Sequence, residues 1–335
     1  MSASERALGA LELRVGDPAR LAAELAGERE RILLEVGFGA AAAAVGAEPG
    51  PRLSVPNRVL GSAPATEVWL SPRPVTRGRR GDLVWAEDGE ALFGCLTREL
   101  GGGTAAAARS VFEEMLALGD ERGYPHLVRV WNFVPGINEE ERGTERYRLF
   151  NVGRAAAFDE RYGEREAERR FSASSAVGTA GARLVTYFAA AAAPASHLGN
   201  PRQVHAYRYP AEYGPRAPSF ARATVAPAAL GGALFLSGTA SVAGHETRHA
   251  GSLDGQLDET LLNIESLLAA GAAGAALPAP GDFDLLRVYL RDPGTLARVE
   301  ERLRRRLGER VPLLFVEADI CRADLLVEIE GVALT

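Results

Sequence analysis

Val311-Pro-Leu-Leu-Phe-Val-Glu-Ala-Asp-Ile-Cys-Arg-Ala-Asp-Leu-Leu-Val-Glu-Ile-Glu-Gly-Val332 is the stretch around which the chain is organised. Its pattern predicts two extended apolar segments joined by a polar turn at residues 321–324. In the second segment, alternation places Glu328 and Glu330 on one side of a strand, with valine and isoleucine on the other. Two carboxylates on one face of a strand need either an exposed edge or a polar cavity. Both interpretations are open at this point.

Composition narrows the class of protein. The 335 residues are 47% hydrophobic, which is enough for one large or two medium domains with a buried core. The net charge of -6 argues against a nucleic-acid-binding surface, and no apolar run reaches the roughly eighteen residues of a membrane span. The N-terminal residues lack the pattern of a secretion signal. We therefore expect a cytoplasmic protein without nucleic-acid or membrane partners.

Cysteine and histidine are scarce. Cys95 and Cys321 fit a reducing compartment and are too few for a disulfide framework. His245 and His249 have the spacing of a metal-binding pair on a helix, but the sequence around them is typical of a loop and offers no third ligand. We therefore expect no metal site.

The first half of the chain contains a strand–helix–strand unit. A strand at 90–97 is followed by a Gly-rich turn and a helix over 105–118, for which Thr104 is the expected N-cap and Gly119 the expected end. A strand at 127–134 completes the unit. Earlier residues show only short alternating pieces, and no role can be assigned to residues 1–60.

The same order of elements returns in the second half. A strand at 233–240 precedes a polar loop, an amphipathic helix over 256–270 and a strand at 285–291. A further helix over 295–307 has an apolar stripe and a charged outer face. We interpret this repetition as a weak internal duplication of two α+β units.

Between the two units lies a segment rich in arginine and tyrosine, spanning residues 146–222. Its Pro and Gly positions predict loops over a sheet, where binding groups often lie. Arginine binds carboxylates through two parallel hydrogen bonds, and tyrosine provides a ring wall with one hydroxyl. This combination suits a small anionic ring compound. A seam between domains also collects such residues and is the alternative interpretation.

Linked motifs from residue 129 to the C-terminus form a recognisable set. They are Arg129-Val-Trp-Asn-Phe-Val-Pro-Gly-Ile-Asn138, Tyr147 with Gly153-Arg154, Ala176-Val-Gly178, Asn200-Pro-Arg-Gln-Val204 with Tyr207 and Tyr213-Gly-Pro215, Ser237-Gly-Thr-Ala-Ser241 with Gly244-His245-Glu246, and Cys321-Arg322 with Val327-Glu-Ile-Glu330. Together they resemble the chorismatase family, whose members cleave chorismate and supply starter acids for polyketide and related pathways.

The resemblance implies a fold. Chorismatases are similar to two fused copies of the small reactive-imine deaminases, whose subunits form trimers with active sites between subunits. We therefore expect an α+β protein of two fused imine-deaminase-like units, with mixed sheets, helices packed on one face and a pseudo-trimer-like arrangement. The expected N-terminal unit spans residues 1–140 and the expected catalytic unit spans 141–335. Whether the protein is a monomer or a trimer stays open.

The resemblance also implies a reaction that needs no metal or organic cofactor. Protonation of the enol methylene of chorismate gives an oxocarbenium ion, which water or the neighbouring ring hydroxyl intercepts before pyruvate leaves. By motif position the resemblance selects Glu328, not Glu330, as the acid. A glutamate between valine and isoleucine in a closed cleft has its pKa raised by desolvation, as this role requires.

The resemblance and the chemistry of chorismate together imply a set of substrate-binding residues. Two arginines are expected to clamp the two carboxylates, three tyrosines to wall the ring and donate hydroxyl groups, and one glutamine to add a polar contact. These residues are Arg154 and Arg222, Tyr147, Tyr207 and Tyr213, and Gln203.

Two positions bear on the product, and they point in opposite directions. Cys321 resembles the branch of the family that forms 3-hydroxybenzoate, where a thiol assists an intramolecular route. Ala240 resembles the hydrolytic branch, which forms 3,4-dihydroxycyclohexa-1,5-dienoate. We expect 3-hydroxybenzoate, because a thiol takes part in proton transfer whereas a methyl group only occludes space. Cys321 as a small buried hydrophobe is the alternative.

Two other functions are alternatives. An imine or enamine deaminase would use Glu328 on a small amino-acid derivative and release ammonia, but residues 312–316 lack the arginine that those enzymes carry on the strand before the last. A non-catalytic binder of aromatic acids would show no turnover.

Overall fold

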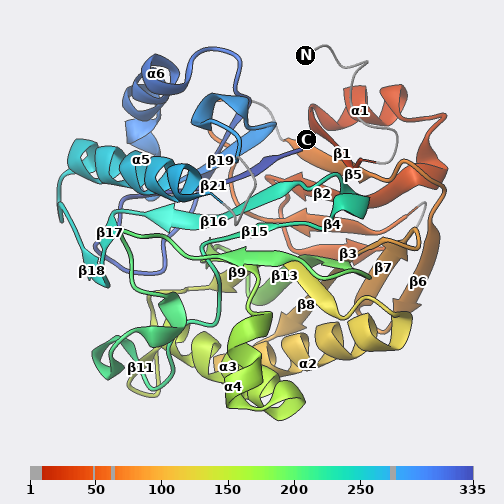
Figure 1. The fold of residues 1–335 in the computed structure, drawn as a ribbon, viewed down its shortest axis with the longest axis horizontal. Helices are drawn as coiled ribbons and strands as arrows, with labels where there is room; N and C mark the ends of the chain where they lie inside the picture. Colours follow the sequence, from red (N-terminus) through yellow and green to blue (C-terminus); the bar gives the residue numbers. More distant parts are fainter. Residues whose placement is uncertain (1–9, 48–49, 62–64, 272–276, 335) are drawn as a thin grey trace.

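Three mixed β-sheets form the frame of the molecule, and helices cover their outer sides (Figure 1). The computed structural model describes residues 10–47, 50–61, 65–271 and 277–334. In these parts of the chain no helix is long and apolar enough to cross a membrane.

The first sheet comes from the N-terminal residues, and its strand pairing is mainly antiparallel. Helix α1 (Pro18–Glu24) packs on it. The strands, in sheet order, are β1 (Glu12–Gly16), β5 (Thr66–Leu70), β2 (Ile32–Phe38), β4 (Arg52–Val55) and β3 (Ala44–Gly46).

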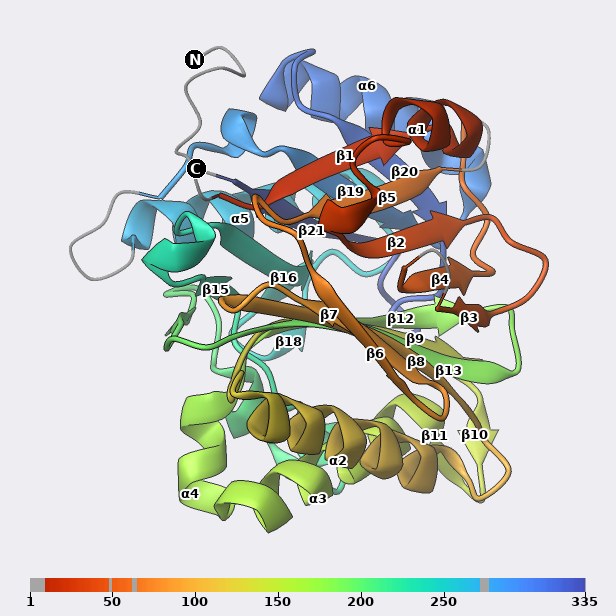
Figure 2. The same ribbon diagram turned by 90° about the vertical axis from the view of Figure 1, so that its right-hand side faces the viewer.

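The middle sheet carries helices α2 (Thr104–Arg122) and α3 (Arg146–Tyr162) on its outer face, followed by the short α4 (Glu164–Ala167) (Figure 2). The strands, in sheet order, are β12 (Ala173–Thr179), β9 (His126–Pro135), β13 (Arg183–Ala191), β8 (Ala91–Glu99), β7 (Leu83–Glu87) and β6 (Thr76–Arg80). A two-stranded hairpin, β10 (Glu140–Glu141) and β11 (Thr144–Glu145), precedes α3.

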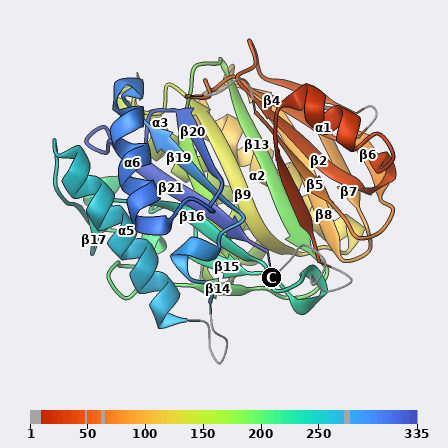
Figure 3. The same cartoon turned by 90° about the horizontal axis from the view of Figure 1, so that it is seen from above.

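The last sheet carries helices α5 (Leu253–Ala270) and α6 (Leu296–Leu307) on its outer face (Figure 3). The strands, in sheet order, are β14 (Ser196–Leu198), β15 (Ala223–Val225), β16 (Leu234–Ala240), β21 (Val327–Ala333), β19 (Leu285–Leu290) and β20 (Leu313–Glu317). A small hairpin, β17 (Val242–Ala243) and β18 (Glu246–Thr247), follows β16.

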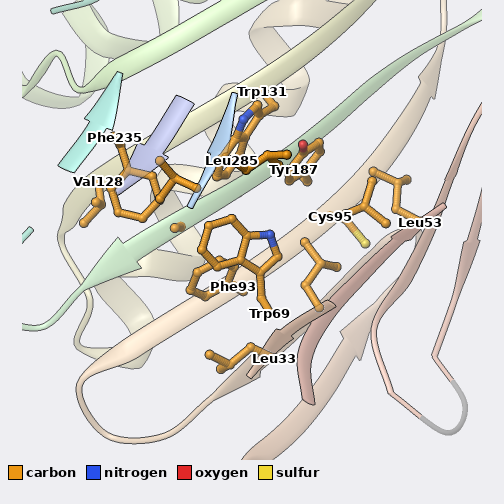
Figure 4. Packing of buried hydrophobic residues seen from close by; sticks show 14 of the residues in the cluster. Leu33, Leu53, Trp69, Phe93, Cys95, Val128, Trp131, Tyr187, Phe235 and Leu285 are labelled. Atoms are coloured by element: carbon orange, nitrogen blue, oxygen red, sulfur yellow. The ribbon is translucent and has the colours of Figure 1, made fainter. Parts of the chain in front are cut away.

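The inner faces of all three sheets meet in one aromatic core (Figure 4). Trp69 comes from the first sheet, Trp131 and Tyr187 from the middle sheet, and Phe235 from the last. The rings of Trp131 and Tyr187 stack with centroids 4.4 Å apart. Apolar burial of this extent holds the sheets together. The expected α+β fold, with helices on one face of each duplicated sheet, is confirmed.

The predicted division at residues 140/141 does not coincide with a division between sheets. The middle sheet takes β6 to β9 from one side of that boundary and β12 and β13 from the other. Because a shared sheet does not by itself define a domain, the two-unit division at this point stays a prediction.

The ends of helix α2 differ from the prediction. Gly103 is the N-cap, because the carboxylate of Glu141 accepts hydrogen bonds from the backbone N–H of Thr104 (3.1 Å) and from its hydroxyl (2.7 Å). Gly119 lies inside the helix, which continues to a left-handed cap at Gly123 with φ 85°. A bond from a residue far along the chain therefore replaces the expected local cap.

The loops predicted over residues 146–179 are largely regular structure. Residues 146–162 form α3, and residues 173–179 form β12. Gly153, which suggested a loop, is where α3 meets α2, since an added Cβ would lie 2.0 Å from the carbonyl oxygen of Ala105. This glycine permits close helix packing.

Candidate active site

Glu328 lies on β21, in the interior of the last sheet. It pairs with Ala240 on β16 and with Tyr289 on β19, and the residue is 3% exposed. An added Cβ at Gly238 would stand 2.1 Å from Glu328 Oε1, so glycine leaves the room that the carboxyl occupies. The exposed-edge interpretation is wrong, because strands flank β21 on both sides.

The environment of Glu328 favours its neutral form. Burial raises the pKa of Glu328 to about 8, and the negative charge of Glu330 acts in the same direction, while Arg129 opposes both. A carboxyl with this pKa holds its proton at neutral pH. Glu328 therefore has the protonation state that proton donation requires.

Glu328 reaches the wall of a cavity bounded by the last sheet, the start of α3 and the segment 203–222. Most of the side chains predicted for the site line this one cavity. They are Tyr147, Gln203, Tyr213, Arg222, Ala240, Cys321 and Glu328.

Arg222 is held in place by neutral groups. Its Nη2 donates to the carbonyl oxygen of Val204 and to the hydroxyl of Tyr209, both at 2.8 Å. Its guanidinium carbon lies 5.2 Å from the ring centroid of Phe220, and its Nε is buried without a hydrogen-bond partner. No carboxylate forms an ion pair with it in the described residues, so its charge is available to an anionic ligand.

Arg154 is buried beside the cavity and is not part of its wall. Its Nη2 donates to Asn151 Oδ1 at 2.8 Å, and its Nε has no partner. Burial lowers its pKa to about 10, so it stays charged at neutral pH. Burial also raises the pKa of Tyr147, whose neutral hydroxyl lies near this guanidinium.

Tyr207 is not brought to the cavity. Its ring stacks on His205, with centroids 5.0 Å apart, and packs against Phe171 at 5.5 Å, in a separate surface hollow. Tyr209 lines the cavity instead and orders Arg222. The two tyrosines are two residues apart, and the sequence around them has no regular period that predicts which side chain faces the cavity.

Other cavity residues were missed. Arg322 lies 4.4 Å from the ring centroid of Tyr213 and donates to the carbonyl oxygen of His245 at 2.9 Å. Arg148 follows Tyr147 directly and forms an ion pair with Glu145 at 3.5 Å. The available signal was in the motifs, since Arg322 is part of the Cys321-Arg322 motif and Arg148 follows Tyr147 directly.

Comparisons with known proteins point to one family. The family model described as "Chorismatase FkbO/Hyg5-like, N-terminal" matches residues 67–190. The "3-hydroxybenzoate synthase" of Streptomyces hygroscopicus is 38% identical over 298 residues, which cover 85% of this chain and 86% of that protein. This chain belongs to the chorismatase family. A "Chorismatase" of Streptomyces rapamycinicus is 37% identical over 294 residues, which cover 85% of this chain and 87% of that protein.

A solved chorismatase structure shares the whole architecture. It covers 97% of this chain and 98% of its own, with a TM-score of 0.88 and 33% sequence identity. The similarity extends over all three sheets, so the first sheet belongs to the chorismatase fold.

The two positions expected to govern the product of this chorismatase lie close together. Cys321 packs against a small hydrophobic cluster that contains Ala240, Ile320 and Leu325. Burial raises the pKa of the Cys321 thiol to about 12, and the nearby Glu328 adds to this shift. Cys321 is therefore a neutral thiol, which donates or relays a proton more readily than it attacks as a nucleophile.

The histidine pair of this chorismatase is not on a helix. His245 Nδ1 lies 3.3 Å from the hydroxyl of Tyr213, and His249 adopts a left-handed turn with φ 56°. In the described parts of the chain, no three His, Cys, Asp or Glu side chains are grouped as metal ligands.

Proposed function

We propose that this chain cleaves the enolpyruvyl ether of chorismate and releases pyruvate and 3-hydroxybenzoate. The observation that carries the proposal is the position of the Glu328 carboxyl, which is buried at a cavity wall, where burial raises its pKa to about 8. The printed names of the relatives, "3-hydroxybenzoate synthase" and "Chorismatase", support the substrate class.

In the proposed first step, Glu328 donates its proton to the methylene carbon of the enol ether. The adjacent carbon becomes an oxocarbenium centre, and the Glu328 carboxylate remains beside it as the counter-charge. The neighbouring ring hydroxyl attacks this centre, and its proton passes to the oxygen that stays on the ring. Collapse of the cyclic adduct breaks the bond between the ring and the attacking oxygen, which leaves as the keto oxygen of pyruvate, and the bond between the pyruvyl carbon and the former ether oxygen, which stays on the ring. The proton lost from the ring on aromatisation returns the acid to its starting state. Pyruvate and 3-hydroxybenzoate together contain all the atoms of chorismate.

The two carboxylates of the substrate need cationic partners. Arg222, which lines the cavity, and Arg154, buried beside it, each have an Nε without a partner. We assign them to the two carboxylates, with Tyr147 and Tyr213 as walls and Gln203 as a polar contact. An Arg–carboxylate pair in a desolvated cleft is stronger than the same pair in water.

Cys321 supports the aromatising product. A neutral thiol near Glu328 is suited to relaying a proton from the ring. Ala240 supports the hydrolytic product, because its methyl group narrows the cavity on the strand beside Glu328. The hydrolytic route consumes one water molecule and leaves 3,4-dihydroxycyclohexa-1,5-dienoate.

The test is to incubate the purified protein with chorismate, follow pyruvate, and separate the ring products by liquid chromatography with mass detection. Pyruvate with 3-hydroxybenzoate in equal amounts is the expected result. Pyruvate with the dihydroxy diene would correct the product and assign the hydrolytic route. Absence of pyruvate, with ammonia released from small imines or enamines, would contradict the proposal and favour a deaminase.

We also propose that the enzyme acts in the cytoplasm. Its free cysteines, Cys95 and Cys321, fit a reducing compartment.

A further inference from the structure

Four buried charged side chains meet where the three sheets join. Glu67 comes from the first sheet, Arg129 from the middle sheet, and Arg287 and Glu330 from the last, and each is at most 2% exposed. Arg129 Nη2 lies 2.6 Å from Glu330 Oε2, and Arg287 forms ion pairs with both Glu330 and Glu67. The Tyr289 hydroxyl donates to Glu330 Oε1 at 3.0 Å. We call the four charged residues the charge quartet.

Stability alone is a poor reason for the quartet. Buried ion pairs often contribute no more to stability than well-packed apolar residues of the same volume, because desolvation of the charges offsets their attraction. Here Arg129 Nη1 and Glu67 Oε2 are buried without hydrogen-bond partners, which adds to the cost. The surrounding core is apolar and aromatic. A functional role explains why charges occupy this place.

The quartet reaches Glu328 through its neighbour on the strand. Glu330 and Glu328 are two residues apart on one face of β21, which separates them by about 7 Å. Arg129 approaches from the middle sheet, where its Nη2 donates to Ser175 Oγ at 2.9 Å. The Cβ of Ser175 lies 3.2 Å from an added Cβ at Gly238, the glycine against which the Glu328 carboxyl packs.

The other titratable and charged groups near Glu328 come from the cavity walls. They are the neutral thiol of Cys321, the neutral hydroxyl of Tyr147, the hydroxyls of Tyr209 and Tyr213, the guanidinium groups of Arg148, Arg222 and Arg322, and the carboxylate of Glu145, which pairs with Arg148. The charges that act on the pKa of Glu328, Glu330 and Arg129, lie outside this wall.

We propose that the charge quartet is a set of positioning residues that keeps Glu330 ionised and thereby keeps the proton of this carboxyl pair on Glu328. Two neighbouring carboxyls in an apolar setting do not both ionise readily, so one of them holds a proton. The two arginines stabilise the charge on Glu330, which leaves the proton to Glu328. The negative charge of Glu67 balances the positive charge of Arg287. The catalytic meaning of this inference rests on the proposed role of Glu328 as acid.

The inference assigns a task to the first sheet. Glu67 is its only member of the quartet, and it lies 220 positions before its partner Arg287 in the chain. The first sheet thus contributes a charge to the electrostatics of a cavity whose walls it does not line.

The test measures the protonation of Glu328 directly, by infrared titration of its carboxyl band with the spectrum of Glu328→Gln subtracted. Glu330→Gln and Glu67→Gln each remove a negative charge, so the midpoint should move to lower pH, by on the order of one pH unit for Glu330→Gln and less for Glu67→Gln. Arg129→Met removes a positive charge while Arg287 still pairs with Glu330 and keeps it ionised, so the midpoint should move to higher pH. The high-pH limb of pyruvate release should move in the same directions.

A matched control is Glu87→Gln. Glu87 is a buried glutamate on β7 that pairs with Arg122 of α2 and does not line the cavity. This substitution should leave the midpoint unchanged. If the quartet had only a structural role, every variant would lower stability. The midpoint of the Glu328 titration would then not shift in a direction set by the sign of the removed charge.

Unchanged midpoints in Glu67→Gln and Arg129→Met, or shifts of the same sign in both, would overturn the inference. If Glu330→Gln does not fold, those two variants still decide, because they change opposite charges. Lack of pyruvate release by the wild type would refute the proposed function alone, since the infrared midpoints are measured without turnover.

Discussion

At the scale of single residues, the chemistry depends on which of two neighbouring carboxyls holds a proton. Glu330 has two guanidinium partners, and Glu328 has none within the described residues. The alternation of the sequence predicted that the two glutamates share a face, and it left open whether that face is exposed to solvent. The partners that distinguish them come from β9 and β19, so no local pattern could reveal them.

The raised pKa of Glu328 predicts a pH profile. Its acid form is present below a pKa of about 8 and is lost above it, so kcat/KM for pyruvate release should be level near neutral pH and fall tenfold per pH unit in the alkaline range. Initial rates at a series of pH values check this. A limb that falls toward acid pH instead would mean that Glu328 acts as a base.

Tyr209 and Tyr207 provide a matched pair of substitutions. Tyr209→Phe removes a hydrogen bond to Arg222, so KM for chorismate should rise by about tenfold, the size expected for a bond to a charged group. Tyr207→Phe should leave kcat/KM within about twofold, because its ring packs on His205 outside the cavity. Steady-state kinetics of both variants decide. Equal effects would contradict the placement of Tyr209 as the cavity residue.

At the scale of elements, strands and helices with a clear apolar period were predictable, and their ends and packing were not. The helices over 256–270 and 295–307 appear within three residues of their predicted bounds as α5 and α6. Residues 146–162 were interpreted as loop because arginine and glycine obscured their period. The glycine there serves contact with α2, which the sequence around it does not encode.

A substitution at Gly238 on β16 tests how the sheet makes room for the Glu328 carboxyl. Gly238→Ala would place a methyl group 2.1 Å from Glu328 Oε1, so the carboxyl must move, and we expect kcat to fall at least about tenfold. Gly37→Ala on β2 is the control, because nothing lies within 3.7 Å of an added Cβ there.

Circular dichroism should show that both glycine variants are folded, and pyruvate release then gives kcat. Full activity of Gly238→Ala would show that the carboxyl position is not constrained by this strand.

At the scale of the whole molecule, three sheets share one core, and the cavity lies between the last sheet, the start of α3 and residues 203–222. The backbone N–H of Ser174 on β12 donates to Ser237 Oγ on β16 at 2.9 Å, which fastens the two sheets beside the cavity. The duplication was visible in the sequence as a repeated order of elements. The first sheet was not visible in the sequence, because its strands are short and strands that pair in it are separated along the chain.

The most direct measurement of the central claim is turnover and binding of chorismate by Glu328→Gln. Removal of a general acid should lower kcat by at least about a hundredfold, while the arginines still bind the substrate and the dissociation constant stays within a few-fold of the wild-type value. Single-turnover pyruvate release and isothermal titration calorimetry give the two quantities. Wild-type rates in Glu328→Gln would remove Glu328 from the reaction and contradict the account.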